Sequence, residues 1–226
     1  MTTSGALRIL LVVIALLLTV WSPGATQALA TRAETCPSPA SSFFDGARYR
    51  IDASQSKFTV KAFAGGLFSG LAHDHTIAIR EFTGETSFTY VTVAPASLQL
   101  TIKADSLTVT DKISDSDREK ITNTMRKEVL EVDKYPEIVF KSNNVVATRT
   151  GEGHYDALIS GDLTLHGVTR GVAIPAKLVF NADNLHARGD FSVRQTQYNI
   201  KPVSIAAGTI KVKDEVKFSF DIVARQ

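Results

Sequence analysis

The sequence has few of the residues and motifs on which cross-linked proteins and common enzymes depend. Its single cysteine, Cys36, cannot form a disulfide within the chain. It contains no Gly-x-Ser-x-Gly elbow, no His-Glu-x-x-His motif and no Gly-rich phosphate loop that ends in Lys-Ser or Lys-Thr. The sequence therefore carries no signal of a hydrolase, a zinc protease or a nucleotide-binding enzyme, and we predict no catalytic residue.

The chain also lacks an excess of charge of either sign. Its 226 residues include 25 lysines and arginines against 23 aspartates and glutamates, which is a formal net charge of +2. Proteins that bind nucleic acids concentrate basic charge on one face. This balance gives no electrostatic case for a nucleic-acid partner.

Long apolar runs are absent after the first thirty residues. Within them, Arg8 precedes an apolar run over residues 9–20, and Ala28-Leu29-Ala30 forms a small-x-small cleavage site. The run is too short to cross a hydrocarbon core of about 30 Å as a helix. We therefore predict a secretory signal peptide over residues 1–30, cleaved after Ala30, and a mature protein that does not span a membrane. An uncleaved N-terminal anchor is the alternative.

Residues 31–47 are rich in Pro, Ser, Thr and Ala and show no apolar period, which predicts a flexible leader. Cys36 lies in it as a free thiol, because Ala33-Glu34-Thr35 does not match the residues that precede a lipidated cysteine. The remaining residues, 48–226, have the length of one β domain that can bury its own core.

Apolar and polar residues alternate with a period of two along most of residues 48–226, as in half-buried strands. The predicted strands cover residues 49–51, 58–62, 76–79, 85–91, 98–102, 138–148, 155–165, 172–180, 191–193 and 216–222. His166-Gly167 stands where a long hairpin would reverse. Because closure removes exposed edges, we predict an all-β, antiparallel, up-and-down β-barrel of about eight strands. Its interior is either filled by side chains or holds one elongated ligand.

One segment, residues 116–132, predicts an amphipathic helix instead. Ser116 and Glu119 have the spacing of a capping box, and Tyr135-Pro136 stops the helix. The apolar stripe of this helix consists of Ile121, Met125, Val129 and Val132. We expect the stripe to pack on the barrel.

Three segments resemble the YceI family of periplasmic, lipocalin-like proteins. They are YRIDASQSKFTVKAF at 49–63, DKYPEIVFKSNNV at 133–145 and SGDLTLHGVTRGVAIP at 160–175. The resemblance runs from about Arg48 to Ala224. It implies a lipocalin-like barrel whose apolar cavity binds a polyisoprenoid chain, such as the tail of a quinone-like lipid, in the periplasm. Ten of the 12 phenylalanines lie beyond the leader, which is compatible with an aromatic cavity lining.

The function predicted on this basis is the binding of a long-chain amphiphile, without catalysis and with no cofactor other than that lipid. The predicted ligand-binding residues are Phe58, Val60, Leu67, Phe68, His73, His75, Phe88, Phe140 and His166. The Gly-rich stretch that contains Leu67 and Phe68 reads as a portal, and the ligand head group is expected near Gly65–His75. That stretch is richer in Gly and His than the family pattern. Phe58 and Phe63 lie on opposite faces of one strand, so both cannot line the interior without a bulge.

Three alternatives remain open at this point. His73 and His75 point to the same side of an extended strand, so with a third histidine, His154, His166 or His186, they would form a metal site in a metal-binding protein or a metal-dependent enzyme. His166 would equally serve as a structural turn residue. A barrel filled by side chains would be a plain interaction module, and no pattern selects a strand as the interface of a homodimer.

Overall fold

Antiparallel strands make up most of the chain that the computed structural model describes, which is residues 47–66, 73–88, 96–181, 184–205 and 209–226. The predicted signal peptide, the leader up to residue 46 with Cys36, and the predicted portal residues Leu67 and Phe68 lie outside the described residues. The predictions made for them are therefore untested.

The first part of the barrel consists of three interrupted strands. These are β1 (Ala47–Ile51) with β2 (Lys57–Gly65), β3 (His75–Ile79) with β4 (Phe82–Phe88), and β5 (Ala96–Lys103) with β6 (Leu107–Val109). In each pair, a short break divides one strand of the barrel into two elements. The first strand pairs with the second through β1 with β4 and β2 with β3. The second strand pairs with the third through β4 with β5 and β3 with β6. A single 3-10 turn, η2 (Ala104–Ser106), separates β5 from β6.

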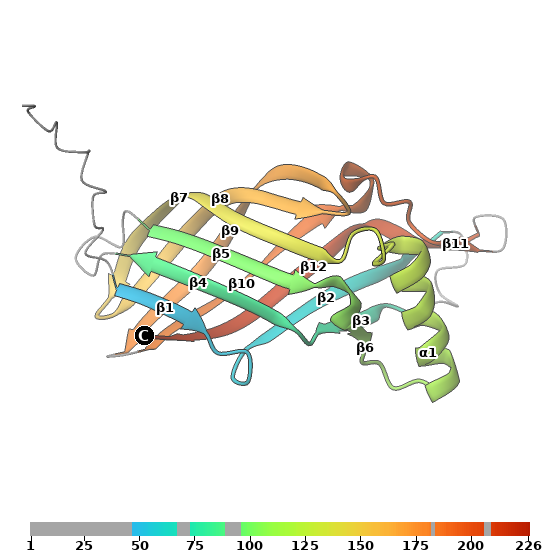
Figure 1. Ribbon diagram of the computed structural model, residues 1–226, viewed down its shortest axis with the longest axis horizontal. Coiled ribbons are helices and arrows are strands. Elements are labelled where there is room, and N and C mark those ends of the chain that lie inside the picture. The colour runs from blue at the N-terminus through green and yellow to red at the C-terminus, as the bar shows by residue number, and fades with distance from the viewer. Residues whose placement is uncertain (1–46, 67–72, 89–95, 182–183, 206–208) are drawn as a thin grey trace, which may run out of the picture. The chain divides into compact units, whose positions relative to one another are not determined.

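Five long strands complete the ring (Figure 1). They are β7 (Glu137–Gly151), β8 (His154–Leu165), β9 (Val168–Asn181), β10 (Asn184–Arg194) and β12 (Ile210–Arg225), and each pairs with its neighbour in sequence. The other edge of β12 pairs with β2 and then with β1, where Ile51 lies opposite Ala224. The short β11 (Ser204–Ile205) also pairs with β12. The prediction of a closed, up-and-down barrel of about eight strands is confirmed.

The predicted helix is confirmed and covers one end of the barrel (Figure 1). It comprises α1 (Asp115–Thr124), a π-helical turn η3 (Met125–Val129), and a cap at Ser114, whose Oγ accepts a hydrogen bond from the Asp117 N–H at 3.1 Å. The predicted cap at Ser116 was wrong by two residues, because Ser114 and Asp117 offer the same spacing two residues earlier. Met125 is buried, whereas the other stripe residues are half-buried. Among the described residues, no helix is long and apolar enough to span a membrane.

The β8–β9 hairpin reverses at His166-Gly167, as predicted. Their φ angles are +50° and +72°, and a two-residue type I′ turn requires positive φ at both positions. The ring of Tyr135 packs against this turn, 4.3 Å from the His166 ring between centroids. Two of the segments that carry the family resemblance, 133–145 and 160–175, therefore meet at the helix end of the barrel.

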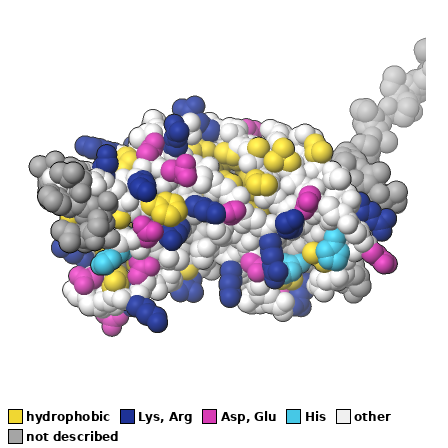
Figure 2. Space-filling model, turned by 180° about the vertical axis from the view of Figure 1, so that it is seen from behind, with side chains coloured by type: hydrophobic (Ala, Val, Ile, Leu, Met, Phe, Trp, Pro, Cys, Tyr) yellow, Lys and Arg dark blue, Asp and Glu magenta, His cyan; other side chains and the backbone are white. Residues whose placement is uncertain are grey.

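The half of the barrel next to the helix is filled. It is packed with side chains that are at most 9% exposed, namely Val60, Ile79, Phe82, Leu107, Val109, Met125, Leu130, Leu165, Val193, Tyr198, Ile200 and Val216. On the outside, basic and acidic side chains are interspersed over the face drawn in Figure 2. The mixed surface of that face agrees with the balanced composition of the chain.

Candidate ligand-binding cavity

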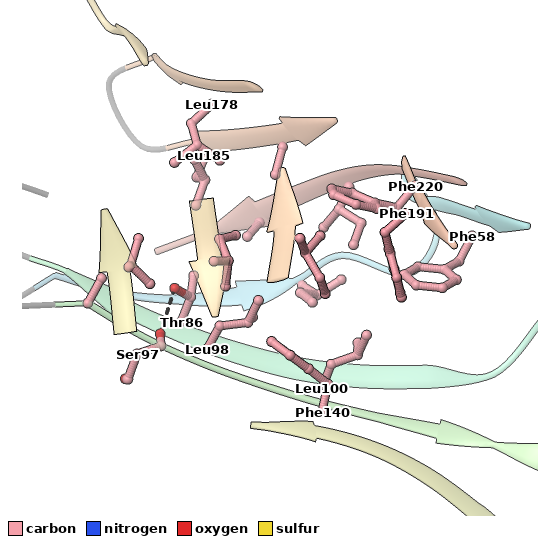
Figure 3. A pocket seen from close by; sticks show the side chains of 18 of the residues that line it. Phe58, Thr86, Ser97, Leu98, Leu100, Phe140, Leu178, Leu185, Phe191 and Phe220 are labelled. Atoms are coloured by element: carbon pink, nitrogen blue, oxygen red, sulfur yellow. Dashed lines mark hydrogen bonds between the residues drawn. The ribbon is translucent and has the colours of Figure 1, made fainter. Parts of the chain in front are cut away.

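An apolar cavity occupies the other half of the barrel (Figure 3). The volume open to the centre of a water-sized sphere is about 110 Å³, and 22 of the 24 described residues that line it are apolar. Seven phenylalanines contribute, from six different strands: Phe58, Phe88, Phe140, Phe180, Phe191, Phe218 and Phe220. A wall of this composition favours an apolar ligand that carries no charge inside the barrel.

The cavity reaches the strand ends opposite the helix. Its lining includes Phe88, the last residue of β4, and Ala96, the first residue of β5. Phe180 and Ala224 lie one residue from the ends of β9 and β12. The rings of Phe88 and Phe180 pack edge to face, with centroids 4.7 Å apart. We call this end of the cavity the mouth.

The two polar lining residues also lie near the mouth. The hydroxyl of Thr86 donates a hydrogen bond to the main-chain oxygen of Ser97 at 2.8 Å (Figure 3). The Ser97 hydroxyl lies 2.7 Å from that of Ser87, on the outer face of the sheet. The polar groups of the cavity wall are thus already hydrogen-bonded, which removes the energetic penalty of leaving them unpaired beside an apolar chain.

Two glycines allow aromatic rings on a neighbouring strand to come close to the barrel wall. A Cβ atom built on Gly161 would stand 2.7 Å from Cζ of Phe140, and one built on Gly189 would stand 2.6 Å from Cζ of Phe220. Real Cβ atoms do not approach other atoms this closely. Because the glycines lack a side chain, the two rings can approach the backbone of the neighbouring strand closely.

The structure divides the predicted ligand-binding residues between the two halves of the barrel. Phe58, Phe88 and Phe140 line the cavity. Val60 is buried in the filled half and does not line it. Phe63, on the opposite face from Phe58, lies outside the barrel wall, as the strand period predicted. Nζ of Lys61 lies 5.4 Å from the centroid of its ring.

The described parts of the predicted head-group region, residues 65–66 and 73–75, lie at the other end of the barrel from this cavity. Gly65 pairs with Lys211 at the start of β12, whereas the cavity lining on β12 runs from Phe218 to Ala224. His73 is exposed, and Nδ1 of His75 lies 2.7 Å from a carboxylate oxygen of Asp111. Sequence periodicity places a residue on the inner or outer face of a strand, but it does not tell which end of the barrel is hollow.

His166 acts as a structural turn residue and does not line the cavity. Its Nε2 lies 2.7 Å from Glu131 Oε2, and its Nδ1 lies 3.2 Å from the main-chain oxygen of Tyr198. Glu131 follows the helix with a φ of +46°, so the histidine ties the helix end to the β8–β9 turn. The alternative in which His166 supports the turn is the one that the geometry favours.

The histidines do not assemble into the predicted metal site. In the described parts of the chain, no group of three or more His, Cys, Asp or Glu side chains is placed to hold a metal ion. His154 Nδ1 bonds to the main-chain oxygen of Glu152 at 2.6 Å, and His186 bonds to Asp221 on the outer wall. The hypothesis of a site built on His73, His75 and a third histidine is therefore corrected.

Several lining residues were not singled out from the sequence, among them Thr86, Ser97, Leu178, Leu185 and Ala187. Alternation already indicates the inward direction of Leu178, Leu185 and Ala187. Only their height along the barrel, which depends on the register between strands, separates them from equally apolar residues of the filled half.

Solved structures with the same fold include three bacterial proteins. BcnA of Burkholderia cenocepacia superposes with a TM-score of 0.59 at 19% identity, covering 76% of this chain and 98% of that one. A polyisoprenoid-binding domain from Saccharophagus degradans, implicated in plant cell wall breakdown, gives 0.53 at 14% identity, with coverages of 78% and 97%. The YceI protein of Campylobacter jejuni gives 0.51 at 13% identity, with coverages of 66% and 84%. At these identities the likeness is one of fold.

Sequence comparison gives the family. A UPF0312 protein of Vibrio parahaemolyticus is 33% identical over 99 residues, which is 43% of this chain, and the chain spans 47% of that protein's length. The model of the YceI-like domain matches residues 49–224, which is the whole barrel from β1 to the end of β12. This chain therefore belongs to the YceI-like domain family.

Proposed function

We propose that this chain is a lipid-binding protein that holds a polyisoprenoid or a similar long-chain amphiphile in the barrel. The observation that carries the proposal is the cavity itself, in which 22 of 24 lining residues are apolar. Each CH₂ group moved from water into such a cavity contributes roughly 0.8 kcal/mol of binding free energy. The tail therefore supplies most of the affinity.

We infer that the head group of the amphiphile lies at the mouth. The two polar lining residues, Thr86 and Ser97, lie at this end, and the mouth is where the strands stop. A polar head there keeps its contact with water, whereas the same head in the apolar interior would lose it at a cost of several kcal/mol.

The relatives support binding of this kind rather than catalysis. One neighbour in fold is described as a polyisoprenoid-binding domain, and the family match covers the whole barrel. The predicted signal peptide adds that the protein works after export, in the periplasm. A carrier or sequestering protein in that compartment would keep an insoluble lipid tail out of water.

The proposal is tested by native mass spectrometry of the mature protein purified from the exported fraction, followed by organic extraction. We expect a co-purifying lipid whose mass shows isoprenoid repeats, on a protein that begins at Thr31. A bound metal without lipid would contradict the proposal. A protein that emerges without lipid and also fails to bind added prenyl alcohols would contradict it as well.

A matched pair of variants links the binding to the cavity. Ala187 lines the cavity from β10, whereas Ala173 is exposed on the outer face of β9. Ala187→Trp puts an indole into the cavity, so we expect it to weaken farnesol binding at least tenfold, about 1.4 kcal/mol. Ala173→Trp adds the same group outside and should bind like the wild type. Equal farnesol binding by the two variants would show that the lipid does not bind in the cavity.

A further inference from the structure

The cavity lining stops at a definite residue on several segments of the wall. On five segments of the wall, the deepest lining residue is followed, two positions nearer the helix, by a buried residue that does not line the cavity. These pairs are Phe58 and Val60, Ile102 and Ala104, Leu163 and Leu165, Phe191 and Val193, and Phe218 and Val216. On each of these five segments the filled half therefore begins directly after the last lining residue.

Three of these last lining residues are aromatic, and we call Phe58, Phe191 and Phe218 the aromatic floor. The rings of Phe191 and Phe218 stack with centroids 5.0 Å apart, and that of Phe58 meets Phe218 edge-on at 6.4 Å. Phe58 also contacts Phe82 below it, at 6.3 Å. Phe58 and Phe218 are each 6% exposed. A side chain so well packed resists displacement by a ligand tail.

The distance from floor to mouth limits the length of tail that fits. On β12 the lining runs from Phe218 to Ala224, and on β9 it runs from Ile174 to Phe180. At about 3.3 Å per residue this is roughly 20 Å along a strand, or about 15 Å along the axis of a barrel whose strands tilt by about 40°. Four carbon–carbon bonds of about 1.5 Å make an extended isoprene unit roughly 5 Å long, so about three units fill the cavity.

We propose that the aromatic floor limits the length of tail that the barrel holds: about three isoprene units lie inside, any further units lie outside the mouth, and shorter tails bind more weakly. The inference rests on the proposed function and deepens it. Units beyond the mouth stay in contact with water, so they add no apolar burial and no affinity. Phe58, Phe191 and Phe218 therefore set the length of tail that lies inside the barrel.

The test is a length series of prenyl alcohols on the wild-type protein. Geraniol, farnesol, geranylgeraniol and a longer polyprenol are compared by displacement of a fluorescent naphthylamine, each below the concentration at which it aggregates. We expect affinity to rise at least about tenfold from geraniol to farnesol and to change less than about threefold beyond farnesol. A further tenfold rise with each longer alcohol would overturn the length limit alone. If no alcohol binds, the proposed function itself fails.

Floor variants test the residues named. Phe58→Ala, with Phe58→Leu as the milder change should the first not fold, deepens the cavity by about one unit. We expect geranylgeraniol to bind at least about tenfold tighter than farnesol in the folded variant. Val60→Ala, on the same face of β2 but below the floor, should keep the wild-type limit. An unchanged limit in a folded Phe58 variant, or the same change in Val60→Ala, would overturn the assignment.

Discussion

At the scale of single residues, the outer wall shows how local charge shifts a titration. Asp221 on β12 accepts a hydrogen bond from His186 and a second from Arg188 Nε at 3.1 Å, both on β10. The hydrogen bond from His186, and after it that from Arg188, holds the pKa of the Asp221 carboxyl below its ordinary value, against the opposing effect of burial. The ionised form of Asp221 is therefore the one that the folded state favours.

Asp221→Asn should reveal this linkage. A carboxyl whose pKa is lowered on folding stabilises the protein above its unfolded pKa, and that contribution is lost as pH falls through the folded pKa. The side chain is 44% exposed, so we expect the variant to lose less than about 1 kcal/mol at pH 7. Urea unfolding should show this difference shrinking as the pH falls below the ordinary range of a carboxyl, about 4. A difference that stays constant with pH would contradict the role given to the charge.

At the scale of elements, the β8–β9 turn is specified by a glycine that meets another part of the chain. Gly167 has a φ of +72°, and a Cβ atom built on it would lie 2.5 Å from Cε1 of Tyr135. Either feature alone disfavours a side chain, and the contact adds a tertiary reason to the local one. The segment after the helix and the tip of the hairpin are therefore held together at this point.

Gly167→Ala should destabilise the protein by about 1–3 kcal/mol, because the new methyl group meets both the strained φ and the Tyr135 ring. The control is Gly171→Ala on β9, where a Cβ atom has no neighbour within 4 Å. That change should be neutral, or stabilising by up to about 1 kcal/mol through the unfolded state. Thermal or urea unfolding measures both. Equal effects would show that the turn does not depend on this contact.

At the scale of the whole barrel, the two halves differ in packing. Leu163 and Leu165 are consecutive inward residues of β8, each 5% exposed, yet Leu163 lines the cavity and Leu165 belongs to the filled half. The free energy lost in a leucine-to-alanine change grows with the number of packed atoms around the site and the void left behind. The pair therefore compares hollow and filled surroundings in one strand.

We expect Leu165→Ala to reduce the free energy of unfolding by about 4–5 kcal/mol and Leu163→Ala by about 2–3 kcal/mol. The difference arises because the side chain of Leu163 already has empty space on one side. Urea unfolding of the lipid-free protein measures both values. An equal loss of unfolding free energy in the two variants would contradict this expectation. It would mean that the surrounding side chains fill the cavity in the lipid-free protein.

Much of the fold could be predicted because it depends on local patterns. The period of two in EVKFSFDIVA places Val216, Phe218, Phe220 and Ile222 on one face of β12, and the structure keeps them on the inner face. The helix likewise followed from its apolar stripe. Its cap was misplaced because Ser114 and Ser116 both stand three residues before an acid, and only the backbone distinguishes them.

The sequence by itself determined the barrel, its aromatic inner face and the family, because strand periodicity and turn chemistry act between neighbouring residues. Only the tertiary structure decided which part of that inner face is hollow. Phe218 and Val216 lie on the same face of one strand, yet Phe218 borders the cavity and Val216 is buried in the filled half. That difference depends on the register of eight strands and on the helix covering one end. Both arise from contacts between segments far apart in the chain, which no local pattern records.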